Sequence, residues 1–369
     1  MKVKWLGVLF GLILLPNWLW GQHLQTRELV PGVRYTTIED TLIPRHIFLL
    51  KINLREKNLH FQTVKAKNRL AGLARLSEMV RSFQAGRVVA ALNGDFFNKS
   101  GIPLNFQAQR GEILREPIAY PVFGFTDSGH PFIRRLHLTG KLISQSGKSI
   151  SVDGVNRQWQ RDEMVYFNSF FGDSTLSNFW GTAVVLRALG KKWKAGRRRF
   201  RVIRISRRHK EAIPKTGAVL ICHGQAEKWV NRNVQTGQTV RLLFDFSPLK
   251  DGVQEATGGL PQILTDGQTT LKFPKKDFTL KRHPRTAVGI SKDGCTLFWV
   301  VVDGRQPDYS FGMTLPELAD FLRKQGAYNA LNLDGGGSTT IIVQGKIANH
   351  PSDAGGERPI SNGWILFQK

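Results

Sequence analysis

Hydrophobic and polar residues alternate with the two-residue period of β-strands over much of the chain. Residues 24–61 show this alternation, most clearly over 47–54, and the apolar runs 88–92 and 297–302 are typical of buried strands. Helical spacing is confined to short stretches, including 70–83 and a helix that Thr314 would cap and Pro316 would open. From about 136 to 249, short apolar runs alternate with glycine turns. This pattern predicts a β-rich insertion.

Two distant segments share one pattern of residues. The segment Leu76-x-Glu-Met…Ala91-Leu-Asn-Gly-Asp95 matches Leu315-x-Glu-Leu…Ala330-Leu-Asn-Leu-Asp334 at a constant offset. Each predicts a helix, a short strand and an Asn-x-Asp loop. We interpret them as a degenerate internal duplication, and we expect an α+β or mixed α/β fold with two pseudo-symmetric helix-strand halves around mixed sheets. Because open α/β sheets bind ligands at strand carboxyl ends, the two loops are expected to face one cleft.

The N-terminus has the layout of a secretory signal. Lys2 and Lys4 precede an apolar run over 5–15, and Gly21 stands near the expected cleavage point. The segment 1–21 therefore predicts a signal peptide and an exported protein, either periplasmic or secreted, with an uncleaved anchor as the alternative. No other long apolar run follows, so no stable membrane insertion is expected after cleavage. A chain of 369 residues is long enough to bury a large core.

The two cysteines, Cys222 and Cys295, lie in apolar strand-like runs. Two buried free thiols are the preferred interpretation, and a disulfide between them is the alternative. Neither cysteine has the spacing of a zinc ligand, so zinc binding through cysteine is not expected.

The formal net charge of +25 favours anionic partners. Much of it lies between Lys191 and Lys215, where apolar residues interleave with arginines as in an exposed strand of a hairpin. A solvated basic edge strand, a docking site for an anionic polymer and a nucleic-acid site are the three interpretations. No RRM, helix-turn-helix or zinc-finger spacing is present, so no nucleic-acid partner is expected.

The candidate chemistry centres on the segment 330–340, in which a strand ends at an aspartate, three glycines and hydroxyl residues. Glycines allow backbone N–H groups to approach an anion closely. A carboxylate beside such a loop points to chemistry on or next to a phosphate. The segment lacks the Gly-Lys-Ser/Thr of a P-loop and the last glycine of a G-x-S-x-G elbow, so nucleotide hydrolysis and a serine nucleophile are disfavoured.

Three arginine-containing clusters share the C-terminal half with this loop. They are Arg282-His-Pro-Arg285, Asp303-Gly-Arg305 and Glu357-Arg358. Alone, the second is more often a plain turn and the third more often a surface ion pair. Together they are more informative, because planar guanidinium groups bind phosphate in a bidentate manner.

At these residues the chain resembles the phosphodiester glycosidase family, and the likeness runs from about Ala90 onward. The shared motifs are Asn93-Gly-x-Phe-Phe, Asn168-x-x-x-Gly172, Ala256-Thr-Gly-Gly-x-Pro261, Leu264-x-x-Gly267, Arg285-Thr-Ala-Val-Gly, Asp303-Gly-Arg, Gly312-Met-Thr-Leu-Pro-Glu-Leu-Ala319, Leu333-Asp-Gly-Gly-Gly-Ser-Thr, and Gly356-Glu-Arg-Pro with Asn362. Their order and spacing make the resemblance specific. It implies a phosphodiester glycosidase domain over 22–369, with about 136–249 as a β-rich, strongly basic subdomain.

The resemblance implies hydrolysis of a sugar-1-phosphodiester, with GlcNAc-1-phosphodiesters as the model substrate. Water attacks the anomeric carbon, and the phosphate stays on the other group. A phosphomonoester has a last pKa of roughly 6, so it leaves without much protonation. Arginines can stabilise the departing anion. A carboxylate is then needed to activate water or to shield an oxocarbenium-like centre.

The residues assigned to these roles follow from the resemblance and from the residue types. The catalytic candidates are Asp334 first, then Asp303, Glu357 and Asp95. The candidates for binding phosphate or sugar are Asn93, Gly258, Gly259, Arg285, Arg305, Asn332, Gly335, Gly336, Gly337, Ser338, Thr339, Arg358 and Asn362.

Two other functions remain open at this point. One is a non-catalytic module that binds anionic glycans of the cell envelope through the basic segment. The other is a metal-dependent phosphodiesterase that breaks the P–O bond. No cofactor is required by the sequence, and a divalent cation on Asp303 and Asp334 is neither demanded nor excluded.

Overall fold

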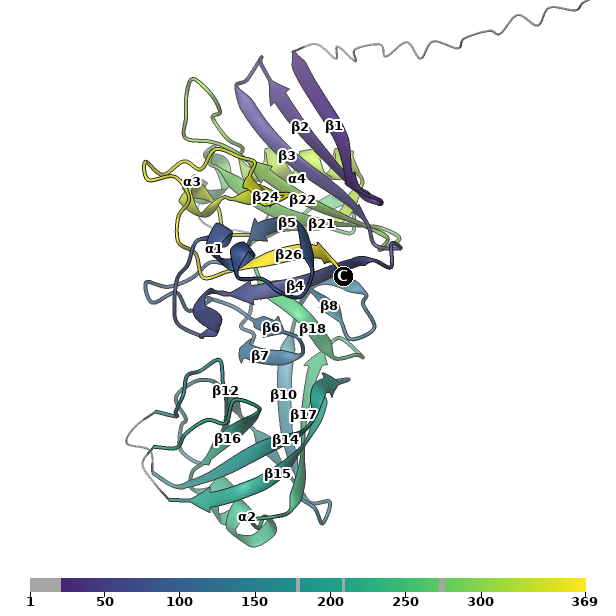
Figure 1. Cartoon of the computed structure of the whole chain (residues 1–369). Coiled ribbons are helices and arrows are strands. Elements are labelled where there is room, and N and C mark those ends of the chain that lie inside the picture. Colours follow the sequence, from purple (N-terminus) through teal and green to yellow (C-terminus); the bar gives the residue numbers. More distant parts are fainter. Residues whose placement is uncertain (1–20, 177–179, 208–209, 272–275) are drawn as a thin grey trace, which may run out of the picture.

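The computed structural model describes residues 21–176, 180–207, 210–271 and 276–369, and it is built mainly from β-strands (Figure 1). Strands account for 49% of the chain and helices for 11%, so the expected α+β or mixed α/β class is wrong. The described strands pair antiparallel everywhere except between β12 and β13. The predicted signal peptide, apart from Gly21, lies outside the described residues. None of the described helices has the length and apolar character needed to cross a bilayer.

The larger part of the molecule contains three antiparallel sheets. Sheet I consists, in order, of β1 (Gln22–Val30), β2 (Val33–Asp40), β3 (Arg45–Asn53), β22 (Thr296–Val302), β21 (Arg285–Ser291), β23 (Ala327–Asn332), β19 (Gln262–Thr265) and β20 (Gln268–Thr269). Sheet II consists of β25 (Lys346–Ile347), β24 (Ile341–Val343), β5 (Arg87–Asn93), β26 (Asn362–Gln368) and β4 (Leu59–Lys65). Sheet III consists of β7 (Glu112–Arg115), β6 (Gln107–Gln109), β18 (Val253–Gly258), β8 (Pro121–Thr126) and β9 (Pro131–Arg135).

Four helices and two 3₁₀ turns complete the described elements. They are α1 (Leu76–Arg81), α2 (Gln225–Asn233), α3 (Lys276–Leu280), α4 (Leu315–Gln325), η1 (Ala66–Asn68) and η2 (Gly336–Ser338). The expected start of α4 is confirmed, since the Thr314 hydroxyl accepts a hydrogen bond from the Glu317 N–H and Pro316 lies in the first turn. The α2 helix lies in the middle segment, where little helical spacing was found.

Sheets I and II pack face to face, and each carries a helix on its outer face. Leu92 and Leu331 belong to the core between the sheets, whereas their neighbours Ala91 and Ala330 pack against α1 and α4 respectively. This alternation follows from the two-residue period of a strand. The two repeated segments are thus equivalent helix-strand units in opposite layers of a sandwich, and the sheets that receive them are antiparallel rather than mixed.

The β-rich middle of the chain forms a fourth sheet of its own, which lies below sheet III in Figure 1. Sheet IV consists of β11 (Ser149–Val152), β10 (His137–Ile143), β17 (Thr239–Ser247), β15 (Arg197–Ser206), β14 (Thr182–Lys194), β16 (Gly217–Cys222), β13 (Met164–Asn168) and β12 (Gly154–Val155). Contacts between β11 and β13 bring its edges together, so the sheet is nearly closed into a barrel. The basic hairpin expected from the sequence is β14–β15, and β15 pairs with β17 as well as with β14.

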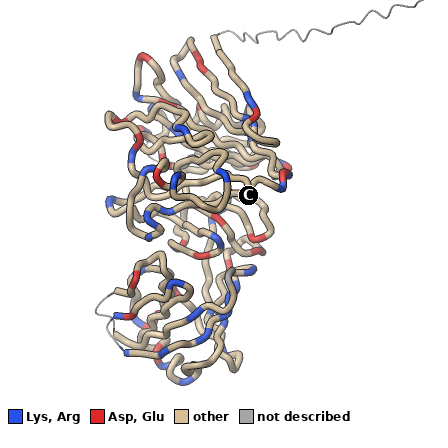
Figure 2. Tube along the Cα trace, viewed as in Figure 1, with Lys and Arg blue, Asp and Glu red and all other residues tan. Residues whose placement is uncertain are grey.

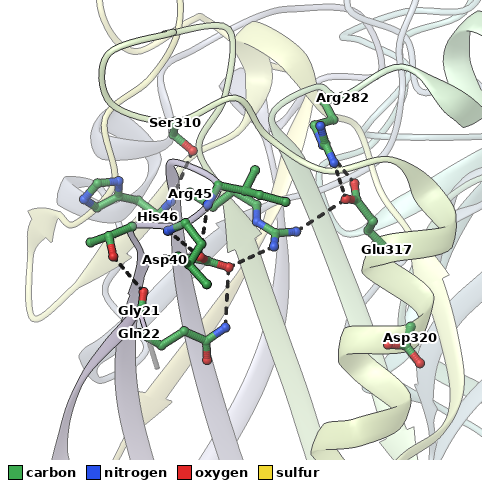
Figure 3. Close-up of polar contacts among 12 residues, drawn as sticks. Gly21, Gln22, Asp40, Arg45, His46, Arg282, Ser310, Glu317 and Asp320 are labelled. Atoms are coloured by element: carbon green, nitrogen blue, oxygen red, sulfur yellow. Dashed lines mark hydrogen bonds and ion pairs between the residues drawn. The ribbon is translucent and has the colours of Figure 1, made fainter. Parts of the chain in front are cut away.

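An ion-pair network ties the N-terminal strands of sheet I to α4 (Figure 3). Arg45 binds Asp40 at 2.9 Å and reaches Glu317 at 3.5 Å, and Glu317 also binds Arg282 at 2.7 Å. The same Glu317 closes the capping box of α4. This network fixes the helix against the sheet whose β21 and β23 supply site residues.

Both cysteines are free, as the preferred interpretation of the sequence predicted, but the expected burial holds only for Cys222. Cys222 is buried in sheet IV, and burial holds the pKa of its thiol far above the usual range. Cys295 is partly exposed.

Candidate active site

The two Asn-x-Asp loops meet at the ends of β5 and β23. The Asp334 N–H donates to the carbonyl oxygen of Gly94 at 3.0 Å, and the Asn93 Nδ2 donates to the carbonyl oxygen of Asp334 at 2.7 Å. Their juxtaposition, which the repeated pattern predicted, brings a loop from sheet I against a loop from sheet II.

A cavity of about 190 Å³ opens beside the second loop. Its lining combines three guanidinium groups, a single carboxylate, three glycines, one imidazole and two aromatic rings. These residues are Phe96, Phe278, His283, Pro284, Arg285, Arg305, Asp334, Gly335, Gly336, Gly337 and Arg358. The cavity therefore brings together the first catalytic candidate, all three predicted phosphate-binding arginines and the glycine loop.

Asp334 is the only acidic side chain among the lining residues. Burial raises the pKa of its carboxyl to about 6, against the Ser338 hydroxyl, the Gly335 N–H and Arg358, which lower it. The Gly335 N–H donates to Asp334 Oδ1 at 2.9 Å, which fixes the orientation of the carboxylate. A carboxylate with this pKa is ionised at neutral pH and can act as a base or a nucleophile.

Asp95 lies within the electrostatic reach of Asp334 but does not line the cavity. Its two carboxylate oxygens accept from the N–H groups of Phe96 at 2.8 Å and Asn105 at 3.0 Å. Burial, and secondarily the charge of Asp334, raise its pKa to about 7. Of the two aspartates, Asp334 is the one that faces the cavity.

Arg285 is a buried cation that pairs with no carboxylate among the described residues. It is 2% exposed, its Nε donates to the Met313 carbonyl at 2.9 Å, and its Nη2 donates to two further carbonyl groups, those of Phe278 and Lys281. Burial, and then the charge of Arg305, lower its pKa to about 10. The Nη1 group makes no hydrogen bond within the described part of the chain. A buried guanidinium held only by carbonyls favours an anion in the adjoining cavity.

Arg305 and Arg358 differ in their partners. Arg305 is exposed and forms no ion pair with any described carboxylate, so it is free to bind an anion. Arg358 is already paired with Asp353 through two hydrogen bonds of 2.7 and 2.9 Å. Arg285 and Arg305 are therefore the stronger phosphate-binding candidates of the three.

Two glycines of the loop lie close to arginine side chains. A Cβ on Gly337 would lie 2.2 Å from the Arg358 Nη2, and a Cβ on Gly336, whose φ is +60°, would lie 3.0 Å from the guanidinium of Arg305. The N–H groups of Gly335 and Gly336 donate to Asp334 Oδ1 and to the Pro284 carbonyl. The loop thus allows arginines to approach the cavity, in addition to any role of its remaining N–H groups.

Two other catalytic candidates lie outside the cavity lining. Asp303 is 1% exposed, and its oxygens accept from the Asn349 Nδ2, the His350 N–H and the Tyr309 hydroxyl. Glu357 accepts from the N–H and the hydroxyl of Ser77 at the start of α1. In these positions, both carboxylates anchor loops that border the site.

Four further predicted binding residues contact the loops of the site but do not line the cavity. The Asn362 Oδ1 accepts from the Asp95 N–H at 2.8 Å, and the Asn332 Nδ2 donates to the Leu260 carbonyl at 2.7 Å. A Cβ on Gly258 would lie 2.7 Å from the Asp95 Oδ2, and one on Gly259 would lie 2.6 Å from the Asn332 carbonyl. These residues hold the loops in place and do not line the cavity.

Several polar atoms around the loop have no partner in the described structure. The hydroxyl of Thr339 and the Oδ1 of Asn332 are buried without a hydrogen bond, and so is the Nδ1 of His283. His283, Phe96 and Phe278 line the cavity but were not selected from the sequence. The motif Arg282-His-Pro-Arg285 contained the signal for His283. Phe96 stands in the motif Asn93-Gly-x-Phe-Phe, whereas no pattern marked Phe278, because its approach depends on the fold.

No group of three histidine, cysteine or acidic side chains gathers as a metal site among the described residues. The two aspartates considered for a divalent cation do not fit one well, because the oxygens of Asp303 are already held by three donors.

Comparisons with known proteins agree with this site. Residues 198–367 match the model of the phosphodiester glycosidase family. This part of the chain is similar to that family. The matched range contains Arg285, Arg305, Asp334 and Arg358, whereas Asn93 and Asp95 precede it. The resemblance inferred from the sequence is thereby confirmed.

Two curated relatives carry the name of an enzyme that acts on phosphodiesters. The N-acetylglucosamine-1-phosphodiester alpha-N-acetylglucosaminidase of Mus musculus is 46% identical over 86 residues, which span 23% of this chain and 16% of the mouse protein. The protein of the same name from Homo sapiens is 45% identical over 69 residues, or 19% of this chain and 13% of the human protein. The alignments therefore cover less than a fifth of either relative.

Solved structures support the fold of the chain as a whole. A Synechocystis protein aligns over 94% of this chain and 64% of its own, with a TM-score of 0.71 and 20% identity. A Burkholderia pseudomallei protein aligns over 89% of this chain and 75% of its own, with a TM-score of 0.63 and 21% identity.

Proposed function

We propose that this protein hydrolyses the glycosidic C–O bond of a sugar-1-phosphodiester, releasing the free sugar and leaving the phosphate on the other group. The observation that carries the proposal is the position of Arg285, a buried guanidinium that pairs with no carboxylate among the described residues, in one small cavity with Asp334. A buried cation of this kind favours binding of an anionic ligand, and the carboxylate beside it can act as a base or a nucleophile.

Arg285 and Arg305 bind and stabilise the phosphate leaving group. The phosphodiester lies against the Nη1 of Arg285 and the unpaired guanidinium of Arg305. Cleavage of the C–O bond leaves the electron pair on a phosphate oxygen, and the two cations stabilise that charge as it develops. A phosphomonoester has a last pKa of roughly 6, so the reaction needs no strong general acid.

Asp334 acts at the anomeric carbon. Its carboxylate either activates the attacking water or bonds to the carbon as a nucleophile, and in both cases it must be ionised. With a pKa of about 6, it is ionised at neutral pH. Asp95 does not line the cavity, and the charge of Asp334 contributes to its raised pKa.

The cavity suits a small sugar such as GlcNAc. Its volume of about 190 Å³ is below the range of drug-sized pockets, roughly 300–1,000 Å³. The rings of Phe96 and Phe278, with centroids 6.1 Å apart, provide apolar surface for the carbon face of a sugar ring. The names of the curated relatives support a GlcNAc-1-phosphodiester as the substrate.

The proposed step uses no divalent cation, because arginines supply the positive charge and Asp303 is occupied by three hydrogen-bond donors. Turnover is therefore expected to survive incubation with EDTA followed by desalting. Loss of turnover that added Mg²⁺ or Ca²⁺ restores would contradict this part of the proposal.

We further place the enzyme outside the cytoplasm, acting on phosphoglycans of the envelope or the extracellular medium. The support is the signal-like segment 1–21 and the basic charge of the chain. N-terminal sequencing of the protein recovered from periplasmic and culture fractions tests this placement. Recovery of only uncleaved protein from the cytoplasm would contradict it.

The bond that is broken decides the function. We would incubate the protein with a GlcNAc-α-1-phosphodiester in ¹⁸O-labelled water and analyse both products by mass spectrometry. Label on the sugar is expected. Label on the phosphate would indicate a P–O phosphodiesterase, and specific binding without any product would indicate a non-catalytic glycan-binding module.

A further inference from the structure

The free positive charge of the middle sheet is concentrated on one face rather than in one segment. Within β15, Arg198 pairs with Glu112 at 3.2 Å and Arg204 pairs with Glu211, so neither is available. The alternate residues Arg197, Arg199 and Arg201 point to the other side of the strand and are exposed.

Neighbouring strands extend this pattern. Directly opposite residues in antiparallel strands share a face. By register, Arg201 stands opposite Arg187 of β14, Arg199 opposite Arg241 of β17, and Leu243 opposite Lys141 of β10. We define the cationic face as Lys141, Arg187, Arg197, Arg199, Arg201 and Arg241. Figure 2 shows the corresponding gathering of basic residues in the lower part of the molecule.

Asp245 of β17 is exposed on the side of the sheet that carries the cationic face, but it does not neutralise this face through ion pairs. None of its six side chains forms an ion pair with a carboxylate anywhere in the described chain. Like charges placed directly opposite each other, as in Arg199–Arg241, destabilise a sheet. An anion bound between the two arginines would relieve this repulsion.

A cavity of about 840 Å³ opens on the same face. The aliphatic side chains of Ile143, Leu189 and Leu243 form its apolar part, and Arg199 and Arg241 stand among them. These three apolar side chains are only half-exposed. The face therefore offers apolar surface between rows of cations, and none of its named residues is aromatic.

We propose that the cationic face binds a polymer of repeating phosphodiesters joined through sugar or polyol units. Repeated cations, about 7 Å apart along a strand and about 5 Å apart across strands, suit a ligand with repeated charges. The aliphatic positions suit the carbon backbone between phosphates. Single-stranded nucleic acid is bound through stacked aromatic rings, and the face presents none. Membrane insertion needs protruding apolar side chains, and here they are half-buried.

This inference rests on the proposed function, because it makes such a polymer the carrier of the sugar phosphodiesters that the active site cleaves. The cationic face lies in sheet IV, whereas Asp334 lies in a loop between sheets I and II. Binding at the face is therefore separable from turnover at the active site.

The test compares two double variants of the full chain with equal charge change. Arg199→Ser with Arg241→Ser removes the opposed pair, and Lys228→Ser with Arg232→Ser removes two exposed cations from α2 as the control. Binding of a synthetic poly(glycerol phosphate) would be measured from 50 to 300 mM NaCl. The first variant is expected to bind at least tenfold more weakly. Its slope of log K against log salt should fall by about 1.5, since each phosphate contact contributes about 0.7–0.9.

The control variant should bind within twofold of the wild type, and both variants should hydrolyse a small GlcNAc-1-phosphodiester at the wild-type rate. Wild-type affinity in the first variant would overturn the inference. Equal or tighter wild-type binding to single-stranded DNA, or to phosphatidylglycerol vesicles at the same salt, would overturn the choice of partner. Absence of hydrolysis by the wild type would contradict the proposed function alone, because the binding measurements test the cationic face independently of turnover.

Discussion

The side chain of Asn93 holds the backbone of Asp334 in place across the interface between two sheets. Its Nδ2 donates to the Asp334 carbonyl at 2.7 Å, and its Oδ1 accepts from the Thr286 hydroxyl at 2.7 Å and from the Thr340 N–H at 3.1 Å. The residue is 1% exposed. One amide thus connects the loop after β5 to the strand and the loop that carry the catalytic carboxylate.

Replacing Asn93 with alanine should harm both stability and turnover. The change leaves three buried polar groups without partners, and each such group costs roughly 1–3 kcal/mol. Small displacements of a catalytic group can cost about 100-fold in rate. We expect a loss of at least about 3 kcal/mol in urea unfolding and a 100-fold lower kcat. Asn231→Ala, on the exposed side of α2, is the control and should change neither quantity.

Substitutions of Asp334 and Glu357 should distinguish a catalytic carboxylate from a structural one. Asp334→Asn is expected to lower kcat by at least about 1,000-fold without loss of folding, because it removes the one carboxylate in the cavity. Glu357→Gln is expected to keep at least a tenth of the wild-type kcat and to lower the melting temperature. Its amide retains only part of the bonding to Ser77. The reverse order of kcat losses would assign the catalytic role to Glu357.

Part of this site was readable from the sequence because its residues follow strands directly. The end of β23 places Asp334 and its glycines in order, and the repeat at 76–95 pointed to the partner loop. Arg285 begins β21, so its position in sheet I also followed from the apolar run after it. Local patterns of this kind specify where a strand ends and what comes next.

The fold class was misjudged because the helices are short and cover sheets whose strands pair over long distances. β5 pairs with β24 and β26, which lie far along the chain, and no local pattern encodes that register. The same limit explains why Asp303 was selected as a catalytic candidate. Its strand-end position resembled that of Asp334, but Asn349 and His350 arrive from a distant loop and occupy its oxygens.

The raised pKa of Asp334 predicts that activity falls on the acidic side of the pH profile. The carboxyl has a pKa of about 6 and must be ionised to act. We expect kcat/KM to rise with pH and to level off above about pH 7. A profile that falls between pH 5 and 7 would show that the protonated carboxyl is the active form, acting as a general acid.

The same shift makes the folded protein lose stability as pH rises. Asp334 has a pKa of about 6 when folded and an ordinary value near 3.8 when unfolded, so the folded state binds more protons between these values. The stabilising contribution is complete below about pH 4 and is lost as pH rises through 6. The free energy of unfolding of Asp334→Asn minus that of the wild type should therefore be larger at pH 8 than at pH 5. The expected increase is about 1–3 kcal/mol. Urea unfolding at both pH values measures this difference, and a pH-independent difference would refute it.

Arg285 and Arg305 should respond differently to substitution because their surroundings differ. Arg305→Ala removes an exposed guanidinium without a carboxylate partner, so we expect unchanged stability and a 10- to 100-fold rise in KM for the phosphodiester. Arg285→Lys keeps a charge but cannot maintain the hydrogen bonds of its Nε and Nη2 to the carbonyl groups of Met313, Phe278 and Lys281. It should lower both stability and kcat. Steady-state kinetics with melting curves test the pair, and an unchanged KM in both variants would remove the arginines from phosphate binding.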